Sequence, residues 1–296
     1  RRRTADGIAC RTKTTREGVR VTTETGTKTS IAQALTHTAV ITKRNLLRNV
    51  RIPQLLIFAT IQPVMFLLLF NYVFGGAITQ GGPAAAAGGY INWLIPGILV
   101  QSAVFGATQT AVGLTEDLRA GVIDRFRSLP MARSAVLTGR TNADTVRNIW
   151  VLGLMLAVGY LIGWRFEQGL PSMLLAVGVV VLFAYSMAWV MACMGLAIKD
   201  TEAVQVAGFL PIFPLVFASS VFVPTDTMPS WLQAFAENQP ITIISNTVRS
   251  LMLPEQALTV IGFEQGTLIW QSLAWITGII VVFSPLAVWL YRRVSD

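Results

Sequence analysis

The stretch MLLAVGVVVLFAYSMAWVMACMGLAI, residues 173–198, contains no charged side chain and is followed directly by Lys199 and Asp200. An apolar run of this length is long enough to cross a hydrocarbon core of about 30 Å as one helix. The stretch therefore predicts a membrane-spanning helix, and the rest of the chain is interpreted outward from it.

The whole composition agrees with a membrane protein. Hydrophobic residues make up 53% of the chain, charged residues only 13%, and the mean hydropathy is +0.58. Soluble domains carry about 25% charged residues. The charges gather in residues 1–52, and residues 1–30 are rich in Thr, Arg and Gly, which predicts a disordered basic tail. Residues 31–296 then form a single transmembrane domain.

Further apolar runs give an all-α fold with six transmembrane helices. The predicted spans are residues 53–74, 93–114, 146–164, 173–198, 203–223 and 268–291.

Basic residues set the predicted orientation, because cytoplasmic loops retain Lys and Arg. With the N-terminus inside, all but two of the 23 basic residues fall on the cytoplasmic side, the exceptions being Arg165 and Arg249. We expect a multi-pass protein of the cytoplasmic membrane with both termini in the cytoplasm. The net charge of +8 is then a signal of topology, and no nucleic-acid partner is expected.

The segment between spans five and six needs a different interpretation. Residues 241–253 are apolar but too short to cross, and they carry Arg249, whose insertion costs about 2.5–3.5 kcal/mol at a helix centre. We expect two short outer helices, one around residues 230–236 and one starting after Pro240, that enter the membrane and return.

Polar side chains inside the predicted spans are candidates for a substrate path, because such groups face protein or a cavity rather than lipid. The candidates are Gln62, Asn71, Gln101 and Gln109. About half of such residues only bond neighbouring helices, so a structural role stays open. Asp144 and Arg147 are three residues apart at the entry to span three, a spacing that predicts a structural ion pair on one helix face.

The polar segment after span two has apolar residues at helical spacing, flanked by charges. A solvated, positively charged loop is one interpretation. The other is a docking helix for a soluble partner, since a helix that lies in a groove uses an apolar stripe of this kind. The candidate docking residues are Glu116, Asp117, Leu118, Arg119, Val122, Asp124, Arg125, Phe126 and Arg127.

Two strings in the sequence resemble a known family. The first comprises Glu116-Asp117, Gly121, residues 124–131 (DRFRSLPM), Arg133, residues 137–140 (LTGR) and Asp144. The second comprises residues 229–232 (PSWL), residues 238–241 (NQPI) and Arg249. Together they resemble the permease subunits of drug-resistance-type ABC exporters, in particular actinobacterial daunorubicin-resistance permeases, over about residues 35–293.

The resemblance implies a type V exporter fold and a transporter of two permeases and two ATPases. ATP and Mg²⁺ would then bind in the separate ATPase subunit, and this chain would hold no cofactor, no metal and no catalytic site. The second permease would be a copy or a paralogue. Residues 31–51 match the family's interfacial lead-in helix, and residues 115–129 match its coupling helix. The implied cargo is a hydrophobic drug-like molecule or a lipid, within a membrane whose lipids also contact the chain.

A rival hypothesis is an integral-membrane enzyme that processes lipids, with its site in residues 224–267. Its candidate groups are Asp226, Glu237 and Glu255. The sequence shows no metal-ligand spacing and no arrangement of nucleophile and base in that segment.

Overall fold

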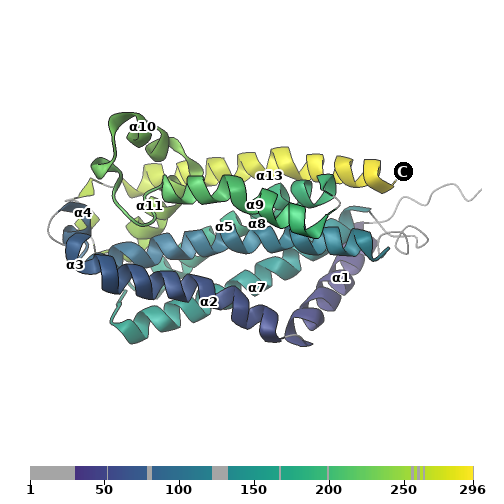
Figure 1. Ribbon diagram of the computed structural model, residues 1–296, viewed down its shortest axis with the longest axis horizontal. Helices are drawn as coiled ribbons and strands as arrows, with labels where there is room; N and C mark the ends of the chain where they lie inside the picture. Colours follow the sequence, from purple (N-terminus) through teal and green to yellow (C-terminus); the bar gives the residue numbers. More distant parts are fainter. Residues whose placement is uncertain are drawn as a thin grey trace, which may run out of the picture.

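The computed structural model describes residues 31–51, 53–78, 82–121, 133–166, 168–198, 200–254, 257–258, 261–262 and 264–295, and its regular elements there are all helical (Figure 1). The predicted tail, residues 1–30, lies outside the described residues. In chain order the helices are α1 (Ile31–Arg51), α2 (Pro53–Leu69), the π-helical turn η1 (Phe70–Phe74), α3 (Gly75–Ile78), α4 (Gly82–Ala86), α5 (Tyr90–Arg119), α7 (Arg133–Ile162), α8 (Leu170–Ala197), α9 (Thr201–Phe217), the 3₁₀ turn η2 (Thr225–Thr227), α10 (Ser230–Asn238), α11 (Pro240–Met252) and α13 (Gln265–Ser295).

Among the described residues four helices, α5, α7, α8 and α13, are long and apolar enough to cross a membrane. Two shorter apolar segments, Ala59–Phe74 in α2 and η1, and α9, coincide with the first and fifth predicted spans. The fold is therefore that of a polytopic helical membrane protein.

Two helices end at residues other than the ends of the predicted spans. The fifth span was expected to reach residue 223, but α9 ends at Phe217, three residues after the second of the two prolines inside it. Since proline has no N–H to donate, Pro211 and Pro214 each remove a hydrogen bond from this helix. The second span was expected to end at residue 114, but its helix continues to Arg119.

The longer α5 also corrects the predicted coupling helix. A single helix over residues 115–129 does not form, because the chain leaves α5 at Ala120 and turns at Gly121, whose φ is +63°. Glycine adopts this left-handed conformation without steric cost, and it commonly ends a helix there. Residues 122–132 lie outside the described part of the chain.

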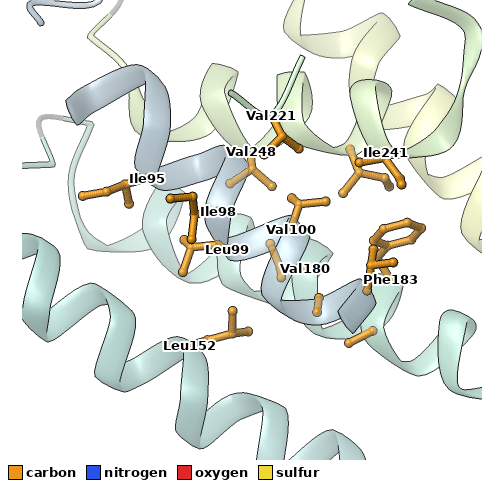
Figure 2. Packing of buried hydrophobic residues seen from close by; sticks show 14 of the residues in the cluster. Ile95, Ile98, Leu99, Val100, Leu152, Val180, Phe183, Val221, Ile241 and Val248 are labelled. Atoms are coloured by element: carbon orange, nitrogen blue, oxygen red, sulfur yellow. The ribbon is translucent and has the colours of Figure 1, made fainter. Parts of the chain in front are cut away.

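Helix α5 is the centre of the bundle. It packs against α2, α7, α8, α9 and α11, and most of its apolar surface is buried. Figure 2 shows its residues Ile95, Ile98, Leu99 and Val100 between side chains of the neighbouring helices. Those neighbours are Leu152 of α7, Val180 and Phe183 of α8, Val221 of the turn after α9, and Ile241 and Val248 of α11.

Small residues permit the closest helix contacts. A Cβ atom built on Gly195 of α8 would lie 2.6 Å from the carbonyl oxygen of Ala111 in α5. The backbones of α5 and α8 therefore touch at this point, which is how small residues bring helices together in membrane proteins.

Two helices, α10 and α11, lie where the sequence predicts a pair of short ones. In Figure 1 α10 lies at the end of the bundle that also carries α3 and α4, opposite α1 and the C-terminus. Helix α11 turns back into the bundle and packs against α5, α8 and α13. We call these two ends of the bundle the α10 end and the α1 end.

Candidate functional site

A cavity of about 220 Å³ opens among α1, α2, α5, α7 and α9. Helix α5 contributes more lining residues than any other helix. In Figure 1 α2 and α9 lie on either side of α5. The apolar lining includes Pro63 of α2, Phe105 of α5 and Phe209 of α9. The charged and amide lining is Asn45, Arg48, Gln62, Gln109, Glu116, Arg140, Asp144, Arg147 and Asn148.

Asp144 of α7 anchors the charged side of this cavity. Its carboxylate accepts a hydrogen bond of 2.8 Å from Thr110 Oγ1 and one of 3.2 Å from Arg140 Nε. Arg147 Nη1 lies 3.5 Å from the same carboxylate, which confirms the predicted pair of Asp144 and Arg147. Arg147 also donates to the carbonyl oxygen of Gly106 at 2.9 Å. These contacts hold the buried carboxylate in place, because removal of an arginine partner would leave a buried charge without compensation.

Arg140 extends the network to α5 and α1. Its Nη1 lies 3.6 Å from Asp117 in α5, and Asp117 also faces Arg44 of α1 at 3.7 Å. The guanidinium occupies space that only a glycine leaves, since a Cβ atom on Gly113 would overlap with it. These contacts join α1, α5 and α7 at the α1 end of the bundle.

A second pair ties α1 to α5: Arg48 Nη2 donates to Glu116 Oε2 at 2.5 Å. Glu116 thus lies on the cavity rim with an intramolecular partner. Each side chain of the pair is about two-fifths exposed.

The end of α5 is also joined to the start of α9. Arg119 pairs with Asp200, whose carboxylate caps α9 by accepting hydrogen bonds from the backbone N–H groups of Glu202 and Ala203. The bond from Ala203, helped by the charge of Arg119, lowers the pKa of Asp200 below its ordinary value. This is the expected behaviour of a carboxylate at a helix N-terminus.

The amide side chains in the cavity are less completely paired than the charged ones. Asn45 Oδ1 accepts a hydrogen bond of 3.1 Å from Arg44 Nη2. Asn45 is buried, and its Nδ2 makes no hydrogen bond in the described part of the chain. Gln62, Gln109 and Asn148 make no side-chain hydrogen bond to any described residue, although all three line the cavity. The site therefore offers unused donors and acceptors next to a fixed set of charges.

The structure brings only part of the predicted substrate path together. Gln62 and Gln109 meet in the cavity. Gln101 is buried in α5 outside the cavity lining, and its Oε1 has no described hydrogen-bond partner. Asn71 lies in the π-helical turn η1 and does not line the cavity either.

The candidate docking residues divide in a similar way. Glu116, Asp117, Leu118 and Arg119 form the last turn of α5, and the three charged ones pair within the chain. Val122, Asp124, Arg125, Phe126 and Arg127 lie outside the described residues.

Sequence reasoning missed Asn45, Arg48 and Asn148 as cavity residues. For Asn148 a signal existed, since it lies one helical turn after Asp144 and on the same face. For Asn45 and Arg48 none existed, because their partners come from helices distant in the sequence.

A second buried polar cluster lies near the α10 end, around Arg249 of α11. The side chain is fully buried and donates to the backbone carbonyls of Trp93, Ser220 and Val221 and to the side chains of Ser220 and Asn246.

The candidate groups of the rival enzyme site do not form a described cluster. Glu237 accepts hydrogen bonds from Thr225 and Gln233, and Glu255 lies outside the described residues.

Comparison with known proteins identifies the class. The family model described as "ABC-2 type transporter" matches residues 36–253. The chain is 31% identical over 265 residues to the daunorubicin resistance ABC transporter permease protein DrrB1 of Streptomyces coeruleorubidus, covering 90% of this chain and 88% of that protein. It is 27% identical to the probable doxorubicin resistance ABC transporter permease protein DrrC of Mycobacterium tuberculosis, covering 91% and 93%. A putative transport permease, ycf38 of Cyanophora paradoxa, is 27% identical over 72% of each chain.

The helical bundle with several membrane-spanning helices agrees with a membrane transport protein. This chain belongs to the ABC-2 type transporter family. It is a permease subunit, and ATP hydrolysis belongs to a separate ATPase subunit. The comparisons give no support to the lipid-processing enzyme.

Proposed function

We propose that this permease exports a hydrophobic, drug-like molecule across the cytoplasmic membrane along the face formed by α2, α5 and α9. The observation that carries the proposal is the cavity among α1, α2, α5, α7 and α9, whose lining includes the polar residues Gln62 and Gln109 and the apolar residues Pro63 and Phe209. Polar groups at the depth of a membrane helix, with no protein partner, are typical of a path rather than of packing. The drug-resistance names of the relatives agree with such a cargo.

Six spans with both termini in the cytoplasm complete the proposal. The α1 end would then face the cytoplasm, because it carries Arg44, Arg48 and Arg119, together with Arg292 and Arg293 near the C-terminus. Retention of Lys and Arg on the cytoplasmic side favours this orientation. Helix α1 would lie along the inner membrane surface, where exposed Leu35, Val40 and Leu47 contact lipid.

The motor would be an ABC ATPase that binds ATP and Mg²⁺ and docks at the α1 end, with a second permease, a copy or a paralogue, completing the transporter. The coupling contacts are assigned to the last turn of α5 and to the candidate residues that follow it. The ion pairs of Glu116 with Arg48 and of Asp117 with Arg44 and Arg140 support this assignment, because a push on the end of α5 would be passed to α1 and α7 through them.

The test compares ATPase activity with transport in proteoliposomes that contain both subunits. In the combined variant Glu116→Gln, Asp117→Asn, Arg125→Gln, cargo should no longer stimulate ATP hydrolysis, while the permease still inserts into the membrane. Normal stimulation and normal complex formation in this variant would contradict the coupling assignment. Asn238→Ala, on the exposed surface of α10, is the matched control and should behave as the unaltered protein.

A further inference from the structure

We infer that the cavity among α1, α2, α5, α7 and α9 binds the acidic head of an amphiphile, a phosphate ester or a carboxylate, whose apolar tail lies outside the cavity. The inference rests on the proposed function only in placing this site on the transport face; the binding itself does not require transport.

The size of the cavity sets the first limit. Pockets that enclose drug-sized ligands measure about 300–1,000 Å³, and this one measures about 220 Å³. A whole drug-like molecule is therefore too large to be enclosed and would lie partly outside the cavity, along the face of α2, α5 and α9, whereas a head group fits inside. Helices α2 and α9, which both contribute to the lining, also carry exposed apolar side chains, Ile61 and Met65 on α2 and Val206 and Leu210 on α9, and these offer a surface for a tail.

The charges in the lining determine which charge the ligand carries. Three guanidinium groups, those of Arg48, Arg140 and Arg147, line the cavity with two carboxylates, those of Glu116 and Asp144. Arg140 also contacts Asp117, which it shares with Arg44, so the network as a whole has four guanidinium groups and three carboxylates. Both carboxylates of the lining are already paired with arginines, so neither is available to a cationic ligand without breaking a pair. The excess positive charge favours an anion.

The hydrogen-bonding groups point to the same ligand. Asn45 is buried, lines the cavity and has an Nδ2 with no partner among the described residues, and a buried donor in this condition costs free energy until an acceptor arrives. The amides of Gln62, Gln109 and Asn148 can donate as well. Phosphate and carboxylate oxygens accept several such bonds at once and pair well with arginine.

Binding is measured on the purified full chain in an uncharged detergent, by thermophoresis with dioctanoyl phosphatidate as the probe. We expect saturable binding that weakens as the salt concentration rises. Dioctanoylglycerol, which has the same tails and no phosphate, should bind about tenfold more weakly or worse, equivalent to about 1.4 kcal/mol. Glycerol 3-phosphate, which has the head and no tail, should also bind more weakly. Equal affinity for all three, or for a cationic amphiphile of the same tail length, would overturn the inference.

The variants Asn45→Asp and Gln109→Glu place a carboxylate in the cavity with little change of shape. Each should weaken phosphatidate binding about tenfold or more, because like charges repel in a partly buried site. Gln109 is only half-buried, so its variant remains informative where Asn45→Asp fails to fold. Asn142→Asp is the matched control: it makes the same change on α7, but Asn142 lines a groove against α1 on another side of the helix. Equal losses in all three variants would contradict a site in the cavity.

Vesicles that contain the permease and its ATPase separate the possible sources of the ligand. ATP-dependent movement of a fluorescent short-chain phosphatidate would identify the amphiphile as cargo, and binding without movement would identify it as a resident membrane lipid; both uphold the site. Absence of phosphatidate binding to a permease that still exports a hydrophobic dye would overturn the inference and leave the proposed function standing. Phosphatidate binding to a permease that exports no cargo with ATP would uphold the inference and contradict the proposed function.

Discussion

The guanidinium of Arg249 lies over the indole of Trp93, 3.9 Å from the ring centroid, and donates through Nε to the carbonyl oxygen of the same residue at 3.0 Å. Its Nη2 donates to the carbonyls of Ser220 and Val221 in the turn after α9, and its Nη1 donates to the side chains of Ser220 and Asn246. One side chain of α11 thus holds together the start of α5 and the end of the α9 segment. No carboxylate pairs with it in the described part of the chain, so carbonyl oxygens and a π face take that role.

Removal of this guanidinium should destabilise the α10 end. In Arg249→Met the buried carbonyls lose a charged donor, and hydrogen bonds to charged groups are worth about 1.5–3 kcal/mol each. We expect a large loss of thermal stability in detergent, measured by tryptophan fluorescence, and a smaller but clear loss in Arg249→Lys, which cannot reproduce the planar fork. The control is Arg165→Met, since Arg165 lies 3.9 Å over the ring of Tyr160 but is exposed. Similar losses for both methionine variants would count against this account of Arg249.

Substitution of Gly97 in α5 tests the same contact between α5, Arg249 and the turn after α9. A Cβ atom built there would lie 3.0 Å from Arg249 Nη2 and would overlap with the backbone carbonyl of Val221. Backbone cannot move aside as a flexible side chain does, so Gly97→Ala should cost about 1–3 kcal/mol. On α7 a Cβ on Gly153 would meet nothing within 4 Å, and Gly153→Ala should be neutral or slightly stabilising. Thermal unfolding in detergent measures both; a neutral Gly97→Ala would show that the contact is looser than described.

The pair of Arg48 and Glu116 tests whether the charges at the end of α5 act within the chain. Arg48→Glu and Glu116→Arg each place like charges together and should loosen α1, seen as faster proteolysis after α1 residues. The double exchange should restore protection. The expected coupling is about 0.2–1 kcal/mol, since both side chains are partly exposed. If the exchange restores protection but not ATPase coupling, Glu116 also contacts the partner subunit; if it restores neither, the ion pair is not what holds α1.

The pH dependence of stability should carry a signature of Asp200. Its pKa is lowered in the folded state by the Ala203 amide and by Arg119, so the charged form is the one that the fold favours. Its stabilisation is therefore complete above the ordinary aspartate pKa of about 3.9 and is lost as the pH falls through the lower folded value. Between pH 5 and 8 we expect no contribution to a pH profile. Asp200→Asn keeps a capping oxygen and loses the charge, so its unfolding midpoint should converge with that of the unaltered protein only below about pH 4.

The apolar helices were predictable because membrane burial leaves a simple record in sequence. Helices α8 and α13 begin and end within about four residues of the predicted spans. The short length of residues 241–253 and the presence of Arg249 likewise predicted a short helix of a different kind, and α11 occupies residues 240–252.

The cavity was only half predictable. Gln62 and Gln109 stood out as polar residues in apolar runs, whereas Asn45 and Arg48 lie in a polar segment where nothing distinguishes them. The break after α5 was missed for a local reason: the apolar spacing of residues 118–129 fits a helix, and only the positive φ of Gly121 ends it. Partners such as Arg48 and Glu116 come from different helices, and periodicity carries no information about such pairs.

The central claim is that this permease works only with a separate ATPase. The most direct measurement is ATP-dependent uptake of a fluorescent hydrophobic dye by inside-out membrane vesicles that contain the permease and its candidate ATPase. The account predicts uptake that needs both subunits and that disappears when the phosphate-binding lysine of the ATPase is replaced. Uptake driven by a proton gradient in vesicles with the permease alone, unaffected by that replacement, would contradict it.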